Sequence, residues 1–334
     1  MNPDTGDVHA NVLLTQVSIG YQPKGYFASK CFPLVPVDKQ TDIYAVYDKS
    51  HWARDLGAAG AAPTGSFQAV RRAPGTRART VGYKLTNTNT YYTTNYAYGI
   101  EIPDELRSNA DAVFDLDRDA TVLLQSLLHL RFDREFATDF VAGTWDNSIT
   151  ISNKWNDYSA STPIEDMRAA ANTLRRATLG MSTEGGAKIC MGALVYQRLL
   201  DHPDIIDRIK YSNSAAQPSK VTENILAQLF EVDELCVARS VFTADEEGTA
   251  EASATYTDVV TDDILLYWTP PSAQRLAPSA GYLFNWKPLT GGGLFFVRKG
   301  RDDRERRDWV EVHAYLDWVM TNSGGGLNNT DAVD

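Results

Sequence analysis

The sequence has few of the residue patterns that a catalytic or metal site requires. Only three cysteines occur among 334 residues, and they form no C-x-x-C pair and no Cys/His cluster: Cys31, Cys190 and Cys236. We therefore expect reduced thiols and no zinc site. The five histidines are scattered and form no His-Glu-x-x-His motif. The residues alone predict no metal and no cofactor.

Two further catalytic patterns are incomplete. Gly291-Gly292-Gly293 is not followed by Lys and Ser or Thr, so it predicts a flexible turn and no Walker-type phosphate loop. The segment 180–184, Gly-Met-Ser-Thr-Glu, lacks the final glycine of a nucleophile elbow. With no nucleophile–base constellation in view, we expect no catalytic residue and a protein that is not an enzyme.

Targeting segments and strong basic charge are also missing. No run of about 18 apolar residues could cross a membrane, and residues 1–7 show no basic region followed by an apolar core, so no secretion signal is expected. The formal net charge of −11 argues against a protein whose main task is to grip nucleic acid. It is compatible with a container whose inner face must not adhere to packaged DNA.

What is present begins with an apolar arm at residues 1–45. Its apolar set contains two prolines, which exclude helix and hold the chain extended: Phe27, Phe32, Pro33, Leu34, Val35, Pro36 and Val37. An extended apolar arm cannot pack on itself, so we expect it to lie on another surface. Candidates for contact with a neighbouring subunit are Phe32, Pro33 and Val35.

Residues 46–98 are extended and polar. Residues 56–66 are small and turn-forming, and residues 81–98 are rich in Thr and Tyr, which favour strands. The pattern predicts a long hairpin, whose arms of roughly 15 residues could reach about 50 Å at ~3.3 Å per residue. Such a hairpin is unstable alone in water and needs a partner surface.

This loop carries a basic set with no acidic residue between Ser66 and Lys84: Arg71, Arg72, Arg77 and Arg79. The set could touch nucleic acid, form a solvated face, or pair with acidic residues of a neighbouring subunit. We favour the third, because residues 101–119 hold seven acidic residues: Glu101, Asp104, Glu105, Asp111, Asp115, Asp117 and Asp119. A second basic set in the turn 299–307 includes Arg304 and Arg306, which could be solvated or could meet a symmetry axis.

Residues 99–185 should contain a long helix at about 115–143. Asp115, Asp117 and Asp119 lie where a helix start favours negative charge. They do not fit a calcium loop, since its sixth and twelfth positions would be Ala120 and Ser126. Apolar residues at three- and four-residue steps predict a broad buried face: Leu116, Ala120, Leu123, Leu124, Leu127, Leu128, Phe132, Phe136 and Phe140. A second helix, 163–179, has Thr162 as its cap and ends at Gly180.

Residues 186–275 alternate short strands and helices. We expect strands at 188–194, 235–241 and 264–268, helices at 195–200 and 221–230, and an exposed loop or hairpin at 243–261. Residues 276–334 contain a second long hairpin at 294–321, turning at 299–307. Its return strand alternates apolar and mostly polar residues with period two. The predicted fold class is α+β.

The sequence resembles the major capsid proteins of tailed bacteriophages, which have the Hong Kong 97 fold. The resemblance rests on F-P-x-V-P-V-x-K-Q-x-D-x-Y from Phe32 and Y-D-K-x-x-W-x-R-D from Tyr47, which contain Trp52 and Arg54. Later motifs are Arg72-Ala-Pro-Gly-Thr76, Asn109-Ala-Asp111 and the segment 202–210. The order of features also matches: N-terminal arm (1–45), extended loop (46–98), peripheral domain with a spine helix (99–185), α/β apical domain (186–275), and a return to the peripheral domain with a long β-hairpin (276–334).

The resemblance implies an icosahedral shell of hexamers and pentamers that encloses double-stranded DNA without sequence-specific binding. It also implies a portal, possible decoration proteins, assembly in the host cytoplasm and a place in the virion. Because residues 50–83 contain no Lys, we expect no covalent crosslink near the loop tip. Because the arm begins near Met1, we expect a separate scaffold protein. The alternatives are an encapsulin-like nanocompartment, a hydrolase with an unrecognised site and, more weakly, a nucleic-acid-binding module.

Overall fold

The computed structural model describes residues 25–47, 49, 72, 74–77, 85–109, 116–212, 221–245, 253–273, 277 and 279–334. The chain divides into two compact units. The smaller is Thr41–Tyr92, and the larger combines Met1–Gln40 with Thr93–Asp334.

The larger unit contains a five-stranded sheet built around the long strand β13 (Arg307–Met320). One edge of β13 pairs with β4 (Thr94–Pro103). The other edge pairs with two strands in succession along its length, β12 (Phe296–Asp302) at 307–313 and β11 (Gly281–Trp286) at 316–320. A parallel edge strand, β1 (Leu34–Val37), completes the sheet beside β11. Its Pro36 cannot donate a ladder hydrogen bond, which an edge strand tolerates.

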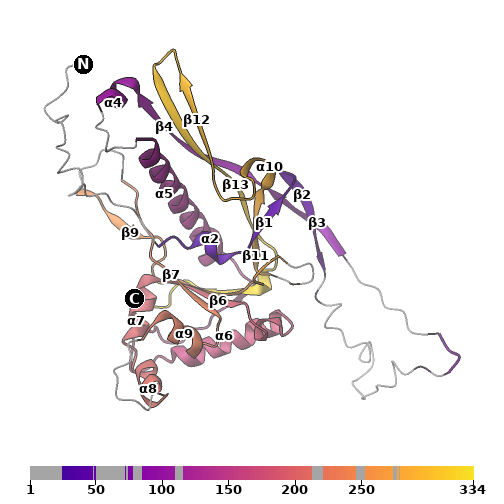
Figure 1. The fold of residues 1–334 in the computed structure, drawn as a ribbon. Coiled ribbons are helices and arrows are strands. Elements are labelled where there is room, and N and C mark those ends of the chain that lie inside the picture. Colours follow the sequence, from indigo (N-terminus) through magenta and orange to yellow (C-terminus); the bar gives the residue numbers. More distant parts are fainter. Residues whose placement is uncertain are drawn as a thin grey trace. The chain divides into compact units, whose positions relative to one another are not determined.

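The β12–β13 hairpin confirms the predicted alternation. Val310, Val312, Ala314 and Leu316 are buried, whereas the residues between them are only half-buried. The turn is shorter than the predicted 299–307, because Lys299–Asp302 continue the ladder and leave 303–306 as the turn. Figure 1 shows α5 lying along this sheet.

The predicted long helix is α5 (Leu116–Phe136), which continues as a π-helical turn at Ala137–Val141. Asp117 and Asp119 occupy its first turn, which confirms the helix-start interpretation. A Cβ on Gly143 would lie 1.9 Å from the Asp139 carbonyl oxygen, so only glycine fits where the segment ends. The buried face is narrower than predicted, because Leu123 and Leu127 are exposed.

The start of the arm differs from the prediction. Residues ahead of Pro33 form a one-turn helix, α2 (Ala28–Cys31), and Phe27 and Phe32 are buried in the core of their own chain. The ring of Phe32 meets Phe136 and Phe140 edge-on at centroid distances of 5.1 and 5.0 Å. The surface on which this part of the arm lies is therefore α5 and the first sheet of the same chain.

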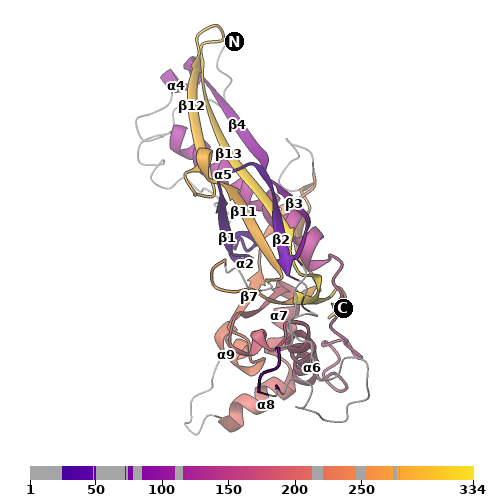
Figure 2. The same cartoon turned by 90° about the vertical axis from the view of Figure 1, so that its right-hand side faces the viewer.

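A second five-stranded sheet lies in the same unit. Its order is β5 (Asn147–Ser148), β14 (Gly326–Asn329), β10 (Ile264–Trp268), β6 (Ala187–Gly192) and β7 (Glu234–Ala238). Four helices accompany it (Figure 2): α6 (Pro163–Ala177), α7 (Ala193–Leu200), α8 (Pro203–Ser212) and α9 (Glu223–Leu229). The alternation predicted for 186–275 is thus confirmed, with β10 at its predicted bounds.

Two local details of this part refine the sequence analysis. The side chain of Thr162 does not cap α6, although its carbonyl oxygen accepts the Asp166 N–H at 3.0 Å. Gly180 ends the segment in the left-handed region at φ 88°, as glycine readily does. The predicted hairpin at 243–261 has strands β8 (Val241–Thr243) and β9 (Tyr256–Asp258).

The remaining short elements complete the larger unit. They are α4 (Asp104–Asn109), α10 (Lys287–Thr290) and the 3-10 turns at Met181–Thr183 and Ser323–Gly325.

The smaller unit is an antiparallel pair, β2 (Thr41–Tyr47) and β3 (Leu85–Tyr92), with a register shift between Tyr44 and Val46. This confirms an antiparallel hairpin, although its described strands have 7 and 8 residues and are shorter than the predicted arms. Its bounds differ from the predicted 46–98, because the Thr/Tyr-rich segment is two strands, and the second of them, β4, pairs with β13 in the larger unit.

Candidate functional site

The acidic residues of β4 and α4 pair with basic residues of the β12–β13 hairpin in the same chain. Arg301 grips Asp104 with two hydrogen bonds of 2.9 and 2.8 Å, and Arg307 pairs with Glu101. The cause is the strand register, which sets Arg307 opposite Pro103 and so brings the hairpin turn beside the start of α4.

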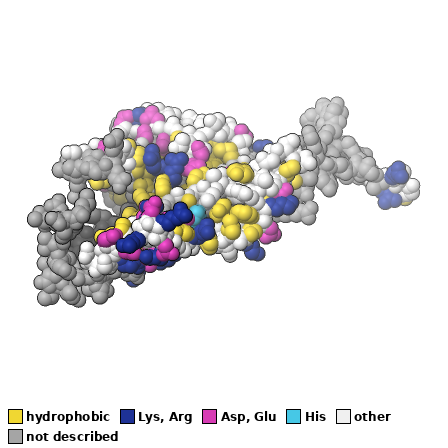
Figure 3. All heavy atoms as spheres, turned by 90° about the horizontal axis from the view of Figure 1, so that it is seen from above, with side chains coloured by type: hydrophobic (Ala, Val, Ile, Leu, Met, Phe, Trp, Pro, Cys, Tyr) yellow, Lys and Arg dark blue, Asp and Glu magenta, His cyan; other side chains and the backbone are white. Residues whose placement is uncertain are grey.

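A second cluster links α4 and α5 to the same hairpin. Arg107 bonds Asp117 at 2.8 Å and Asp308 at 3.0 Å, and Lys299 approaches Asp117 at 3.6 Å. The hydrogen bond from Arg107 holds the pKa of Asp117 below its usual value, as Arg301 does for Asp104. Seen from above in Figure 3, basic and acidic side chains lie interspersed around this end of the larger unit.

These pairs change the expected partners of the acidic stripe. Asp104, proposed from the sequence as a contact to the loop arginines of a neighbour, is held by Arg301 of its own chain. A contact between Asp104 and a neighbouring subunit stays a prediction, for a carboxylate that is already paired within its own chain. Glu105 is exposed on α4, and Asp111 lies outside the described residues.

The tip of the hairpin keeps two exposed arginines. The backbone of Arg306 adopts a positive φ of 51°, and its carbonyl oxygen accepts the Asp104 N–H at 3.0 Å. The Arg304 N–H donates to the Asp302 carboxylate at 3.0 Å. The main chain of the turn is thus fastened, and both side chains face solvent.

The other contact candidates separate into three groups. Phe32 is 2% exposed within its own core, so the expectation that it touches a neighbouring subunit is wrong. Pro33 and Val35 are half-buried, and Arg72 and Arg77 are exposed. Trp52, Arg54, Arg71 and Arg79 lie outside the described residues.

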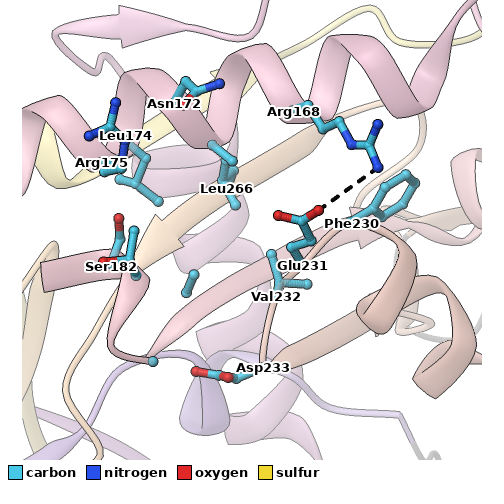
Figure 4. A pocket seen from close by; sticks show the side chains of 14 residues that line it. Arg168, Asn172, Leu174, Arg175, Ser182, Phe230, Glu231, Val232, Asp233 and Leu266 are labelled. Carbon is cyan, nitrogen blue, oxygen red and sulfur yellow. Dashed lines mark ion pairs between the residues drawn. The ribbon is translucent and has the colours of Figure 1, made fainter. Parts of the chain in front are cut away.

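A groove of about 390 Å³ opens between α6, the Met181–Thr183 turn and residues 230–233. Figure 4 shows Arg168 of α6 reaching across it toward Glu231, at 3.8 Å. Ser182, from the incomplete nucleophile pattern, lines the groove, but no histidine is among the described lining residues. The groove therefore places no histidine beside this serine, and its described carboxylates are Glu231, which faces Arg168, and Asp233.

The structure reveals one Ser–His pair that the sequence analysis missed. Ser161 Oγ lies 2.9 Å from His202 Nε2, and both residues are buried. The Asp204 N–H donates to His202 Nδ1 at 3.3 Å, which leaves the ring proton on Nε2 as a donor to Ser161. The Ser161 hydroxyl in turn donates to the Asp157 carbonyl oxygen at 2.7 Å.

The hydrogen-bond directions of the Ser161–His202 pair fit a structural role and not a nucleophile activated by a base. A general base must accept the hydroxyl proton, whereas here the histidine donates and burial lowers its pKa further. The carbonyl oxygen of His202 accepts the N–H groups of Ile205 and Ile206, at the start of α8, at 3.2 and 3.1 Å. His202 therefore fastens that helix to residues 157–161.

The three cysteines, distant in sequence, meet in the core. Cys190 and Cys236 are opposite one another on the parallel strands β6 and β7. Cys31 of α2 packs in the same core cluster, and its thiol donates to the Phe27 carbonyl oxygen at 3.4 Å. All three are free thiols, and hydrogen bonding to Cys236 together with burial raises the pKa of Cys190. Among the described residues no cluster of His, Cys, Asp or Glu could hold a metal ion, and none of the described helices is long and apolar enough to cross a membrane.

Comparison with solved structures defines the fold class. The chain shares its fold with a phage-related protein from Bordetella bronchiseptica RB50 (TM-score 0.64, 18% identity, 96% of this chain and 97% of that chain). It also matches the capsid structure of cyanophage P-SCSP1u (TM-score 0.57, 11% identity, 98% and 94%). The SrpI encapsulin of Synechococcus elongatus PCC 7942 matches at a TM-score of 0.50, with 11% identity over 98% and 96%.

Sequence comparison gives a related result. The chain is 23% identical over 288 residues to the major capsid protein of Burkholderia phage BcepMu, covering 82% of this chain and 83% of that protein. No protein-family model matches the chain.

Proposed function

We propose that this chain is the major capsid protein of a tailed phage and builds an icosahedral head shell by self-assembly. The observation that carries the proposal is that the fold matches a phage capsid structure over nearly the whole chain, together with the sequence likeness to a major capsid protein. The role is structural, and the chain's work is assembly rather than turnover. We further propose the Hong Kong 97 arrangement of arm, extended loop, spine helix, apical domain and peripheral hairpin.

The smaller unit supports this proposal because its described residues form no hydrophobic core. Among the described residues of Thr41–Tyr92, only Tyr91 is a buried hydrophobic side chain, so the hairpin has no core of its own. A two-stranded hairpin in water gains stability only from a partner surface. We propose that this surface belongs to neighbouring copies, which hexamers and pentamers would provide.

The contact residues remain proposals of the same kind. On the loop they are Trp52, Arg54, Arg71, Arg72, Arg77 and Arg79; elsewhere they are Pro33, Val35, Glu105, Asp111, Arg304 and Arg306. We also propose a separate scaffold protein, a portal, possible decoration proteins, enclosed double-stranded DNA, assembly in the host cytoplasm and a place in the virion.

Electron microscopy of the expressed chain, with and without its neighbouring genes, tests the shell proposal. We expect closed or partial shells, or hexamer and pentamer rings. A monodisperse monomer or dimer under every condition would contradict it. An encapsulin-like compartment is the second candidate, favoured by the SrpI match; shells that hold protein cargo and no DNA would decide for it.

Deleting residues 55–75 should leave soluble subunits and abolish stable shells. The deletion removes the loop tip and two of the loop arginines, but it leaves both described strands of the hairpin. Sedimentation and microscopy of the variant beside the full chain measure the effect. Intact particles from the variant would refute the role of the loop.

Mature particles boiled in SDS should give a single band near 37.0 kDa. Residues 50–83 contain no Lys that could supply an amine for a crosslink near the loop tip. Ladders of higher mass would contradict this expectation.

A further inference from the structure

An apolar strip runs along the exposed side of α5. Leu123 and Leu127 are 51% and 42% exposed, and Leu116 and Leu130 are partly exposed. Steps of seven, four and three residues place the four leucines on one line of the helix. Single exposed leucines are ordinary, but four in a line form the ridge onto which a second helix packs.

The first described residues of the chain attach to α5 near the C-terminal end of this strip. The ring of Tyr26 stacks on His129, with centroids 4.8 Å apart. His129 lies about 100° around α5 from Leu130 of the strip, on a side where its ring also meets Phe295 edge-on. The N–H groups of Phe27 and Ala28 bond to Asp133, one turn further along α5. The 24 residues that precede Gly25 are therefore tethered at the C-terminal end of the strip.

The sequence of that N-terminal stretch matches the strip in pattern and length. Ala10, Leu13, Leu14 and Val17 have the spacing of one apolar helical face, and Asp7 and Gly20 are residues favoured at helix ends. Twelve residues, 8–19, would span about 18 Å as a helix, and the strip from Leu116 to Leu130 spans about 21 Å. The six residues 20–25 are long enough to join the two.

We propose that residues 8–19 dock as an amphipathic helix on the α5 strip of their own chain. The short tether gives the segment an effective concentration in the millimolar range, so even a modest contact stays closed. The docked segment would cover Leu123 and Leu127 and keep other copies off this face. The contact belongs to the single chain and does not depend on shell formation.

Crosslinking on dispersed subunits tests which chain covers the strip. We would combine Leu14→Cys with Leu127→Cys and treat the full chain with a short bismaleimide; each single variant shows the background of the native thiols. We expect an intrachain bridge within the 37.0 kDa band, several-fold above a control that pairs Leu14→Cys with Leu106→Cys. Leu106 is 54% exposed on α4 and lies off the strip.

Two results would overturn the proposal. A crosslinked dimer would mean that a neighbour's segment occupies the strip, and a yield equal to the Leu106 control would mean that no segment does. Both are read on subunits, so they are independent of whether shells form.

Hydrogen exchange gives a second measurement without new cysteines. In the unmodified chain we expect amides of residues 8–19 to be protected by about tenfold or more, as a docked helix requires. Leu123→Asp with Leu127→Asp should abolish that protection, whereas Leu106→Asp should preserve it. Exchange of residues 8–19 at the unprotected rate in the parent chain would overturn the proposal.

Discussion

Phe32→Ala is expected to lower the free energy of unfolding of the isolated subunit by about 3–5 kcal/mol. The side chain is buried, and its ring meets Phe136, Phe140 and Tyr267 edge-on at centroid distances of 5.1, 5.0 and 5.7 Å. Truncation removes this apolar contact and leaves a cavity in the core that joins α2, α5 and the first sheet.

The packing around Phe32 is too tight for the site to collapse easily. A Cβ on Gly281 would lie 2.4 Å from the Phe32 ring, so the ring rests directly on the backbone of β11. Backbone moves less readily than a side chain, which places the expected loss toward the upper part of the range.

Denaturant unfolding of dispersed subunits measures the effect, with Val35→Ala as the matched control. Val35 lies three residues away on β1 and is only half-buried, so its truncation should cost less than about 1.5 kcal/mol. If Phe32→Ala left subunit stability unchanged and damaged only assembly, the ring would serve a neighbouring subunit, as the sequence alone suggested.

The arm shows why that suggestion failed. The two prolines correctly predicted an extended chain, and β1 is extended. Nothing local to residues 27–32 reveals that their partners are Asp133 and Phe136, more than 100 residues later. An arm that needs a surface can find it on its own chain, and only the tertiary structure identifies which.

The charged residues illustrate the same limit. The hairpin 294–321 was predictable, because a period-two pattern is local. The pairing of this hairpin with β4 is not local. The register of that pairing places Arg301 beside Asp104 and Arg307 beside Glu101. Composition could identify complementary stripes, but it could not tell a contact within one chain from a contact between copies.

Asp133→Asn should remove a pH dependence that is built into the attachment of the arm. Asp133 is buried on α5 and accepts the N–H groups of Ala28 and Phe27 at 2.9 and 3.2 Å, while its second oxygen has no hydrogen-bond partner among the described residues. Burial raises the pKa of this carboxyl to about 6, against the opposing effects of the Ala28 N–H, the nearby Ser240 hydroxyl and the Phe27 N–H.

The sign follows from proton binding. Between about pH 4 and pH 6 the folded state holds the proton on Asp133, whereas the unfolded chain has released it. The contribution of Asp133 to stability is therefore largest below pH 4 and is lost as pH rises through 6. A difference of about two pKa units corresponds to roughly 3 kcal/mol.

Asparagine keeps an oxygen for Ala28 and Phe27 and carries no charge at any pH. The stability of Asp133→Asn relative to the parent should therefore rise by roughly 3 kcal/mol between pH 4 and pH 7. Denaturant unfolding of both proteins at several pH values measures this difference in stability. The carboxylates that the two proteins share contribute equally to both, so their effect cancels in the difference. Asp139→Asn, an exposed carboxylate on the π-helical turn, is the matched control.

Asp133→Ala separates the charge from the hydrogen bonds. It also abolishes the titration, but it leaves two buried N–H groups without an acceptor, at about 1–3 kcal/mol each. It should therefore be less stable than Asp133→Asn at every pH. A stability difference between Asp133→Asn and the parent that stays constant from pH 4 to pH 7 would show that the buried carboxyl does not titrate with folding, and that the arm is fastened by hydrogen bonds alone.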